Sequence, residues 1–69
     1  MDITIKFGKK FKQIRLKRRL SQGKLAKILN LHPTYISGIE RGVRNLSLKN
    51  IEKFAKALDV KLKDIFNDF

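Results

Sequence analysis

The sequence predicts an all-α domain of five short helices, and two observations carry that prediction. Apolar side chains recur at spacings of three and four residues along the chain, which is the period of a helix with one buried face. No segment shows the strict alternation of a half-buried strand, and no stretch is repeated. A chain of 69 residues suffices for one compact domain, so we expect a single unit over residues 1–69.

The first two helices are placed by apolar spacing and a capping residue. The stripe that begins at Phe7 and continues to Ile14 predicts a helix at about residues 4–18. Ser21 has the hydroxyl typical of an N-cap, and the apolar residues after it predict a second helix over 22–29.

Two further helices follow in the same way. Pro33 suits the first position of a helix, because its missing N–H would have no partner there. This third helix is expected over about 33–41, before Gly42, the usual residue for a left-handed C-cap. Ser47 is a second N-cap candidate, and it precedes a fourth helix with a stripe over 48–58.

The end of the chain predicts a fifth helix with more apolar surface than one small domain needs. Leu62, Ile65, Phe66 and Phe69 fall at i, i+3, i+4 and i+7, which is one face of a helix. We expect Leu62 and Ile65 to face the core and the rings of Phe66 and Phe69 to meet a second copy of the chain. The region of about 58–69 is therefore the expected dimerisation region.

The chain is strongly basic, and the charge is unevenly placed. Seventeen lysines and arginines face six acids, for a formal net charge of +11. Residues 1–39 hold ten of the basic side chains and a single acid, Asp2. A solvated helix face normally mixes both signs, so a half-chain nearly free of carboxylates indicates a polyanionic partner, either DNA or RNA.

Composition excludes several classes of function. One histidine, no cysteine and one acid before residue 40 provide no nucleophile with a base and an orienting group, so we expect no enzyme. The same inventory provides no metal site, and it indicates no cofactor and no small-molecule ligand. No apolar run is long enough for a membrane span and no signal peptide is evident. The lack of cysteine favours a reducing, cytoplasmic location.

Two other partners for a basic domain are weaker hypotheses. A membrane surface would take the apolar face of the first helix, which so small a domain needs for its own core. RNA would require an aromatic stacking platform, whereas most of the phenylalanines lie on stripes that face the core.

The centre of the chain, over about residues 22–41, has the arrangement of a helix-turn-helix unit. On a wheel of its second helix, Ile36 and Ile39 point inward. The opposite face carries small or hydrogen-bonding side chains: Thr34, Ser37, Gly38 and Arg41. Such a face can lie deep in the major groove, where hydroxyl groups meet base edges.

These residues also carry a family resemblance. The chain resembles helix-turn-helix domains of the Cro and lambda-repressor type in Leu20-Ser21-Gln22, Leu25-Ala26, Ile36-Ser37, Ile39-Glu40-Arg41-Gly42 and Ala57-Leu58-Asp59-Val60. More narrowly, the segment from Thr34 to Arg41, followed by Arg44-Asn45-Leu46-Ser47, resembles the controller proteins of restriction–modification systems. The resemblance implies a lambda-repressor-like fold and a homodimeric transcriptional regulator that binds a palindromic operator in duplex DNA.

The resemblance also implies residue roles. Thr34 and Ser37 would contact bases, and Tyr35 would lie near a base or the backbone. Phosphates would be contacted by Gln22, Arg41, Arg44 and Asn45.

One further role is structural, and three positions depart from the family pattern. Arg15 and Glu40 would form an ion pair between the first and third helices. Pro33 stands where controllers often have a polar or basic base-contacting residue. Gly23 replaces the usual glutamate, and Arg19 stands where a glycine usually ends the first helix.

An antitoxin-like protein that neutralises a toxin and binds DNA secondarily is the alternative function. Such proteins usually need an additional segment to wrap the toxin, and this chain ends one turn after the expected fold closes. We therefore favour the regulator.

Overall fold

The computed structural model describes residues 2–67 and 69, and that part of the chain forms helices without any strand. The elements are α1 (Ile3–Lys17), α2 (Gln22–Leu29), α3 (Pro33–Glu40), α4 (Leu48–Leu58) and α5 (Leu62–Phe66). The prediction of an all-α fold of five helices is thus confirmed. None of the described helices is long and apolar enough to cross a membrane.

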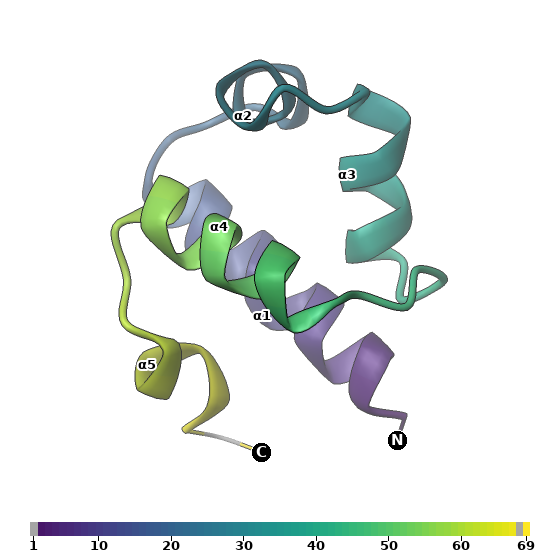
Figure 1. The fold of residues 1–69 in the computed structure, drawn as a ribbon, viewed down its shortest axis with the longest axis vertical. Helices are drawn as coiled ribbons and strands as arrows, with labels where there is room; N and C mark the ends of the chain where they lie inside the picture. Colours follow the sequence, from purple (N-terminus) through teal and green to yellow (C-terminus); the bar gives the residue numbers. More distant parts are fainter. Residues whose placement is uncertain (1, 68) are drawn as a thin grey trace.

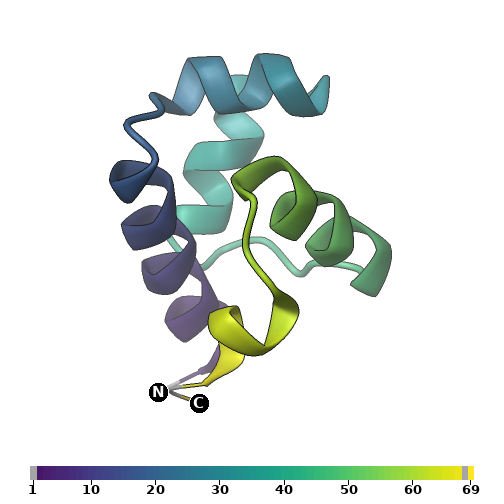
Figure 2. The ribbon, with the colours of Figure 1, turned by 90° about the vertical axis from the view of Figure 1, so that its left-hand side faces the viewer.

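The helices enclose one core. Figure 1 shows α2 across one end of the molecule, α3 along one side, and α4 passing in front of α1. In Figure 2 the chain returns to the start of α1, where α5 covers the opposite end. α3 packs against both α1 and α2, and α5 packs against α1 and α4.

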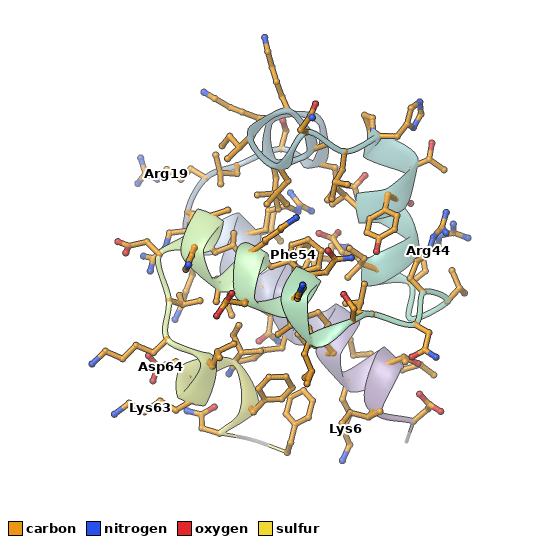
Figure 3. The ribbon with its side chains drawn as sticks, viewed as in Figure 1. Lys6, Arg19, Arg44, Phe54, Lys63 and Asp64 are labelled. Atoms are coloured by element: carbon orange, nitrogen blue, oxygen red, sulfur yellow. The ribbon has the colours of Figure 1, made fainter. Side chains whose placement is uncertain are left out.

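The core is made by the predicted apolar stripes. Phe54 reaches from α4 into the interior in Figure 3, and its ring meets that of Phe11 edge-on at a centroid distance of 5.2 Å. The buried apolar side chains are Phe7, Phe11, Ile14, Leu25, Ala26, Ile36, Ile39, Phe54, Ala55, Leu58 and Ile65.

The capping residues define where the helices begin. The hydroxyl of Ser21 accepts a hydrogen bond from the Lys24 amide at 3.0 Å, and that of Ser47 accepts from the Asn50 amide at 3.2 Å. Each side chain satisfies an amide that the first helical turn leaves without a partner. Both serines are therefore the N-caps that the sequence predicts.

Left-handed residues separate the helices, and one of them is unusual. Gly42, with φ of 77°, and Asn30, with φ of 57°, are residue types that tolerate this conformation. Arg19 adopts φ of 57° after α1, at a cost of about 1–2 kcal/mol for a side chain with a Cβ. The chain thus accepts strain at the position where the sequence lacks the usual glycine.

The prediction of the fifth helix is partly wrong. α5 ends at Phe66, whereas the apolar stripe predicted a helix that continues to Phe69. Ile65 is buried as expected, but Leu62 is 46% exposed instead of facing the core. Phe66 is half-buried, and its ring lies 5.8 Å from that of Phe7 on α1, so Ile65 and Phe66 are the residues that join α5 to the core.

Candidate nucleic-acid interface

The helix-turn-helix unit is formed by α2 and α3, joined by a short turn over residues 30–32. Asn30 ends α2 in the left-handed conformation, and His32 is the N-cap of α3. The His32 Nδ1 atom accepts a hydrogen bond from the Thr34 amide at 3.1 Å. Pro33 at the first helical position has no amide to satisfy, so the first turn of α3 is well capped.

A buried ion pair fixes α3 against α1. Arg15 donates from Nε to Glu40 Oε2 at 2.6 Å and from its terminal nitrogen to Oε1 at 3.1 Å. The two side chains are only 7% and 4% exposed. A further guanidinium nitrogen donates to the carbonyl of Leu20 at 2.7 Å. The bidentate geometry is the strong form of an Arg–carboxylate contact. Together with the bond to Leu20, it joins α1, α3 and the turn between α1 and α2.

Gln22 belongs to the same cluster. Its Nε2 donates to Glu40 Oε1 at 3.0 Å, and the residue is half-buried at the first position of α2. The structure therefore places this predicted phosphate contact beside the ion pair. The hydrogen bond holds the side chain at the N-terminal end of α2, where helix amides favour an anion.

The outer face of α3 differs from the helical wheel at one residue. Thr34 and Arg41 are exposed and Ser37 is half-buried, all on the predicted side. Gly38 was expected on this outer face, but it is buried. The chain after α3 folds back, and the Arg44 side chain covers Gly38.

Arg44 packs against two residues of α3, Tyr35 and Gly38. Its guanidinium carbon lies 4.9 Å from the centre of the Tyr35 ring, which is a cation–π contact. The Tyr35 hydroxyl in turn accepts a hydrogen bond from Asn50 Nδ2 at 3.2 Å. A Cβ on Gly38 would lie 3.0 Å from Arg44 Cγ and 3.1 Å from Nε, so the glycine makes room for the arginine.

Asn50 is a residue that the sequence analysis missed. It lies in the first turn of α4, where a polar side chain usually faces solvent, and it is half-buried against Tyr35 instead. Its position depends on how residues 43–47 cross from α3 to α4, and no local pattern specifies that path. Asn45, a predicted phosphate contact, is exposed in this connection next to Arg44.

The positive charge is not confined to the α3 side. Figure 3 shows Arg44 beside α3, whereas Arg19 and Lys63 lie on the opposite side of the molecule. Arg18 is engaged in the fold, because it donates from Nε to the Leu58 carbonyl at 2.7 Å and from a terminal nitrogen to the Asp59 carbonyl at 2.9 Å. These carbonyls end α4, where a cation is favourable.

A second surface feature is an apolar cavity of about 300 Å³ between α1, α4 and α5. Ile3 and Leu48 on its wall are 61% and 86% exposed. Phe66 also lines it, and the ring of Phe69 packs edge-on against Phe66 at 5.1 Å while staying 40% exposed. The predicted dimer residues thus lie together, and Ile3 and Leu48 extend their surface.

Comparison with known proteins finds a helix-turn-helix family and, as similar proteins, several control or controller proteins. A helix-turn-helix family model matches residues 11–65. The control protein C.BamHI of Bacillus amyloliquefaciens is 57% identical over 96% of this chain and 83% of its own. The crystal structure of the restriction–modification controller C.AhdI from Aeromonas hydrophila is 43% identical, with a TM-score of 0.85, and covers 91% of this chain and 96% of its own. The controller C.Esp1396I, crystallised as a tetramer with its natural 35 base-pair operator, is 40% identical, with a TM-score of 0.86 over 97% of this chain and 88% of its own.

The ion pair generates the first prediction. Arg15→Ala or Glu40→Ala should each lower the free energy of unfolding by about 3–5 kcal/mol, because each leaves a buried charge without its partner. The double variant should lose much less than the sum, since neither charge then remains. Urea denaturation of the four proteins measures this. An Arg15→Ala protein that melts like wild type but no longer binds DNA would make Arg15 a phosphate contact instead.

The Gly38 contact generates the second prediction. Gly38→Ala should displace the Arg44 side chain and lower the affinity for duplex DNA toward that of Arg44→Ala, with little change in melting temperature, because only a flexible side chain must move. Gly23→Ala is the matched control: a Cβ there meets nothing within 4 Å. That control should bind DNA normally and gain up to about 1 kcal/mol of stability. Equal DNA affinity of both variants would contradict the role given to Gly38.

Proposed function

The chain belongs to the helix-turn-helix family and, within it, to the controller proteins of restriction–modification systems, and from this we propose that it regulates transcription as a homodimer bound to operator DNA through α3. Two-fold symmetry of the dimer implies a palindromic operator, with half-sites about one helical turn, ~34 Å, apart. A cytoplasmic location accords with this function. The proposal assigns the chain no catalytic activity and no cofactor.

The outer face of α3 supports this proposal most directly. Thr34 and Ser37 offer hydroxyl groups without bulk. Arg41 lies at the C-terminal end of α3, and Arg44 lies over Tyr35 and Gly38. Short polar side chains flanked by cations suit a helix that enters the major groove between two phosphate backbones. The relative C.Esp1396I was crystallised with its natural operator, which supports DNA as the partner of this chain.

We assign the contacts in two classes. Thr34 and Ser37 contact base edges. The ring of Tyr35 lies under Arg44 and its hydroxyl is bound by Asn50, so its contact with a base or the backbone is made jointly with Arg44. Phosphate oxygens are contacted by Gln22, Arg41, Arg44 and Asn45.

The apolar surface formed by Ile3, Leu48, Phe66 and Phe69 is our candidate dimer interface. Ile3, Leu48 and Phe66 line the cavity, and Phe69 packs against Phe66. Ile3, Leu48 and Phe69 are exposed, and a contiguous apolar patch of this kind often marks an interface. Leu48 begins α4 directly after the connection that carries Arg44 and Asn45, and both of these residues also line the cavity. Pairing through this surface would therefore fix the distance between the two DNA-contacting faces.

The antitoxin-like alternative has less support. C.BamHI, C.AhdI and C.Esp1396I are all described as control or controller proteins. We therefore retain the regulator and do not propose a toxin partner.

A salt titration separates the two classes of contact. Arg44→Ala should weaken binding to cognate and scrambled duplexes alike, and should reduce the slope of log K against log salt by about 0.9 per lost phosphate contact. Thr34→Ala and Ser37→Ala should leave the slope unchanged and narrow the gap between cognate and scrambled DNA, because a lost base contact costs about 1–3 kcal/mol of discrimination. The cognate duplex is one that the wild-type protein selects from a random library.

The same titration can refute the assignment. If Thr34→Ala and Ser37→Ala both preserve the ratio of cognate to scrambled affinity, α3 is not the helix that determines sequence preference. A wild-type protein that selects no duplex at all would refute the proposed function itself.

The dimer interface generates a further prediction. Leu48→Asp should leave the fold intact, because this side chain is 86% exposed, but it should convert the dimer to a monomer by placing a charge in the interface. Leu16→Asp is the matched control, since Leu16 is 55% exposed on α1 and does not line the cavity. Sedimentation equilibrium measures both. A Leu48→Asp protein that remains dimeric would move the interface elsewhere.

A further inference from the structure

His32, the N-cap of α3, has a second ring nitrogen that takes part neither in the fold nor in the DNA contacts proposed above. His32 Nδ1 accepts the hydrogen bond from the Thr34 amide, at 3.1 Å. A ring nitrogen that accepts a hydrogen bond carries no proton, so a neutral His32 has its proton on Nε2. The cap therefore selects the tautomer, and it leaves Nε2–H as a hydrogen-bond donor.

The Nε2–H donor of His32 lies at the end of α3 where the proposed DNA contacts begin. His32 is exposed, and so are the two residues that follow it, Pro33 and Thr34. The two ring nitrogens point in diverging directions, so with Nδ1 turned toward the Thr34 amide, Nε2 faces away from the helix. Within residues 2–67 and 69, no protein group pairs with Nε2. The donor thus lies in solvent at the N-terminal end of the face assigned to base contact.

The residue type supports a role beyond capping. Serine, threonine, asparagine and aspartate are the usual N-caps, and the chain itself uses Ser21, Ser47 and Asp2 for this purpose. A serine would cap α3 equally well but would present no donor away from the helix. An aspartate would bring a carboxylate toward the phosphates. A neutral histidine caps with one nitrogen and offers a donor with the other.

We infer that His32 is a further DNA-contacting residue, which caps α3 through Nδ1 and donates a hydrogen bond from Nε2 to an acceptor on duplex DNA. The inference rests on the proposed function, because it requires α3 to lie against the groove. The DNA atoms that can accept this hydrogen bond are the phosphate oxygens and, on the base edges, purine N7, guanine O6 and thymine O4.

Three substitutions separate the donor from the cap. His32→Ser keeps a cap acceptor and removes the outward donor. His32→Asn keeps both, since its amide has an oxygen acceptor and a nitrogen donor. His32→Ala removes both. We expect the serine and asparagine variants to melt like wild type and the alanine variant to melt at a lower temperature, as measured by circular dichroism.

DNA affinity then tests the contact, with the duplex that the wild-type protein selects and a scrambled duplex of the same composition. His32→Ser should bind the selected duplex about 3- to 10-fold more weakly than wild type, the cost of one hydrogen bond, and His32→Asn should recover most of the loss. A loss confined to the selected duplex supports a base acceptor, and an equal loss on both duplexes supports a phosphate acceptor.

Wild-type behaviour of the serine variant would contradict the contact. If His32→Ser melts and binds like wild type, His32 is a cap and nothing more, and the inference is overturned. That result is distinct from failure of the proposed function, in which the wild-type protein itself selects no duplex.

Discussion

The buried pair of Arg15 and Glu40 is the interaction on which the placement of α3, the helix that we propose contacts DNA, depends. Two charges removed from water cost several kcal/mol each unless their hydrogen bonds are satisfied. Here the carboxylate receives three donors, two from Arg15 and one from Gln22, and the guanidinium also binds the Leu20 carbonyl. No buried side-chain nitrogen or oxygen among the described residues lacks a partner. Few arrangements of α1, α2 and α3 could satisfy all of these groups at once, so the pair restricts the angle between the helices more sharply than apolar contact would.

The ion pair fixes only one end of α3, and the rest of the interface is built outward from it. Glu40 holds the C-terminal end, while the His32 cap and Pro33 define the N-terminal end. At the C-terminal end, α1 also approaches so closely that a Cβ on Gly8 would lie 2.3 Å from the Ile39 carbonyl oxygen. A helix that is capped at its start, paired through Glu40 at its end and packed on α1 and α2 presents its outer side chains in a defined arrangement before any DNA is present. That pre-organisation reduces the ordering cost of binding.

The sequence predicts the elements of this molecule better than the contacts between them. Caps such as Ser47 and Gly42 are local features, and apolar spacing is a property of one helix, so both can be recognised without knowing the fold. The burial of Gly38 and the exposure of Leu62 depend on segments that pack later in the chain, and a helical wheel contains no information about them. The contact of Asn50 with Tyr35 likewise depends on the path of residues 43–47. The pairing of Arg15 with Glu40 was expected from family resemblance, and not from spacing.

The distribution of carboxylates explains how a basic surface can support selective binding. Positive charge occurs on several sides of the molecule, so charge alone would allow DNA to approach in many orientations. The acid within α3 and the acid directly before α1 are each engaged: Glu40 is buried in its ion pair, and Asp2 caps α1. Hydrogen bonds from the Thr4 hydroxyl and amide lower the pKa of Asp2, so this cap stays ionised to a lower pH than a free carboxyl group would. Because the Glu40 side chain is buried in its ion pair, α3 presents no free carboxylate to phosphates. Under the function that we propose, preference for one sequence then depends on a few neutral donors on that helix.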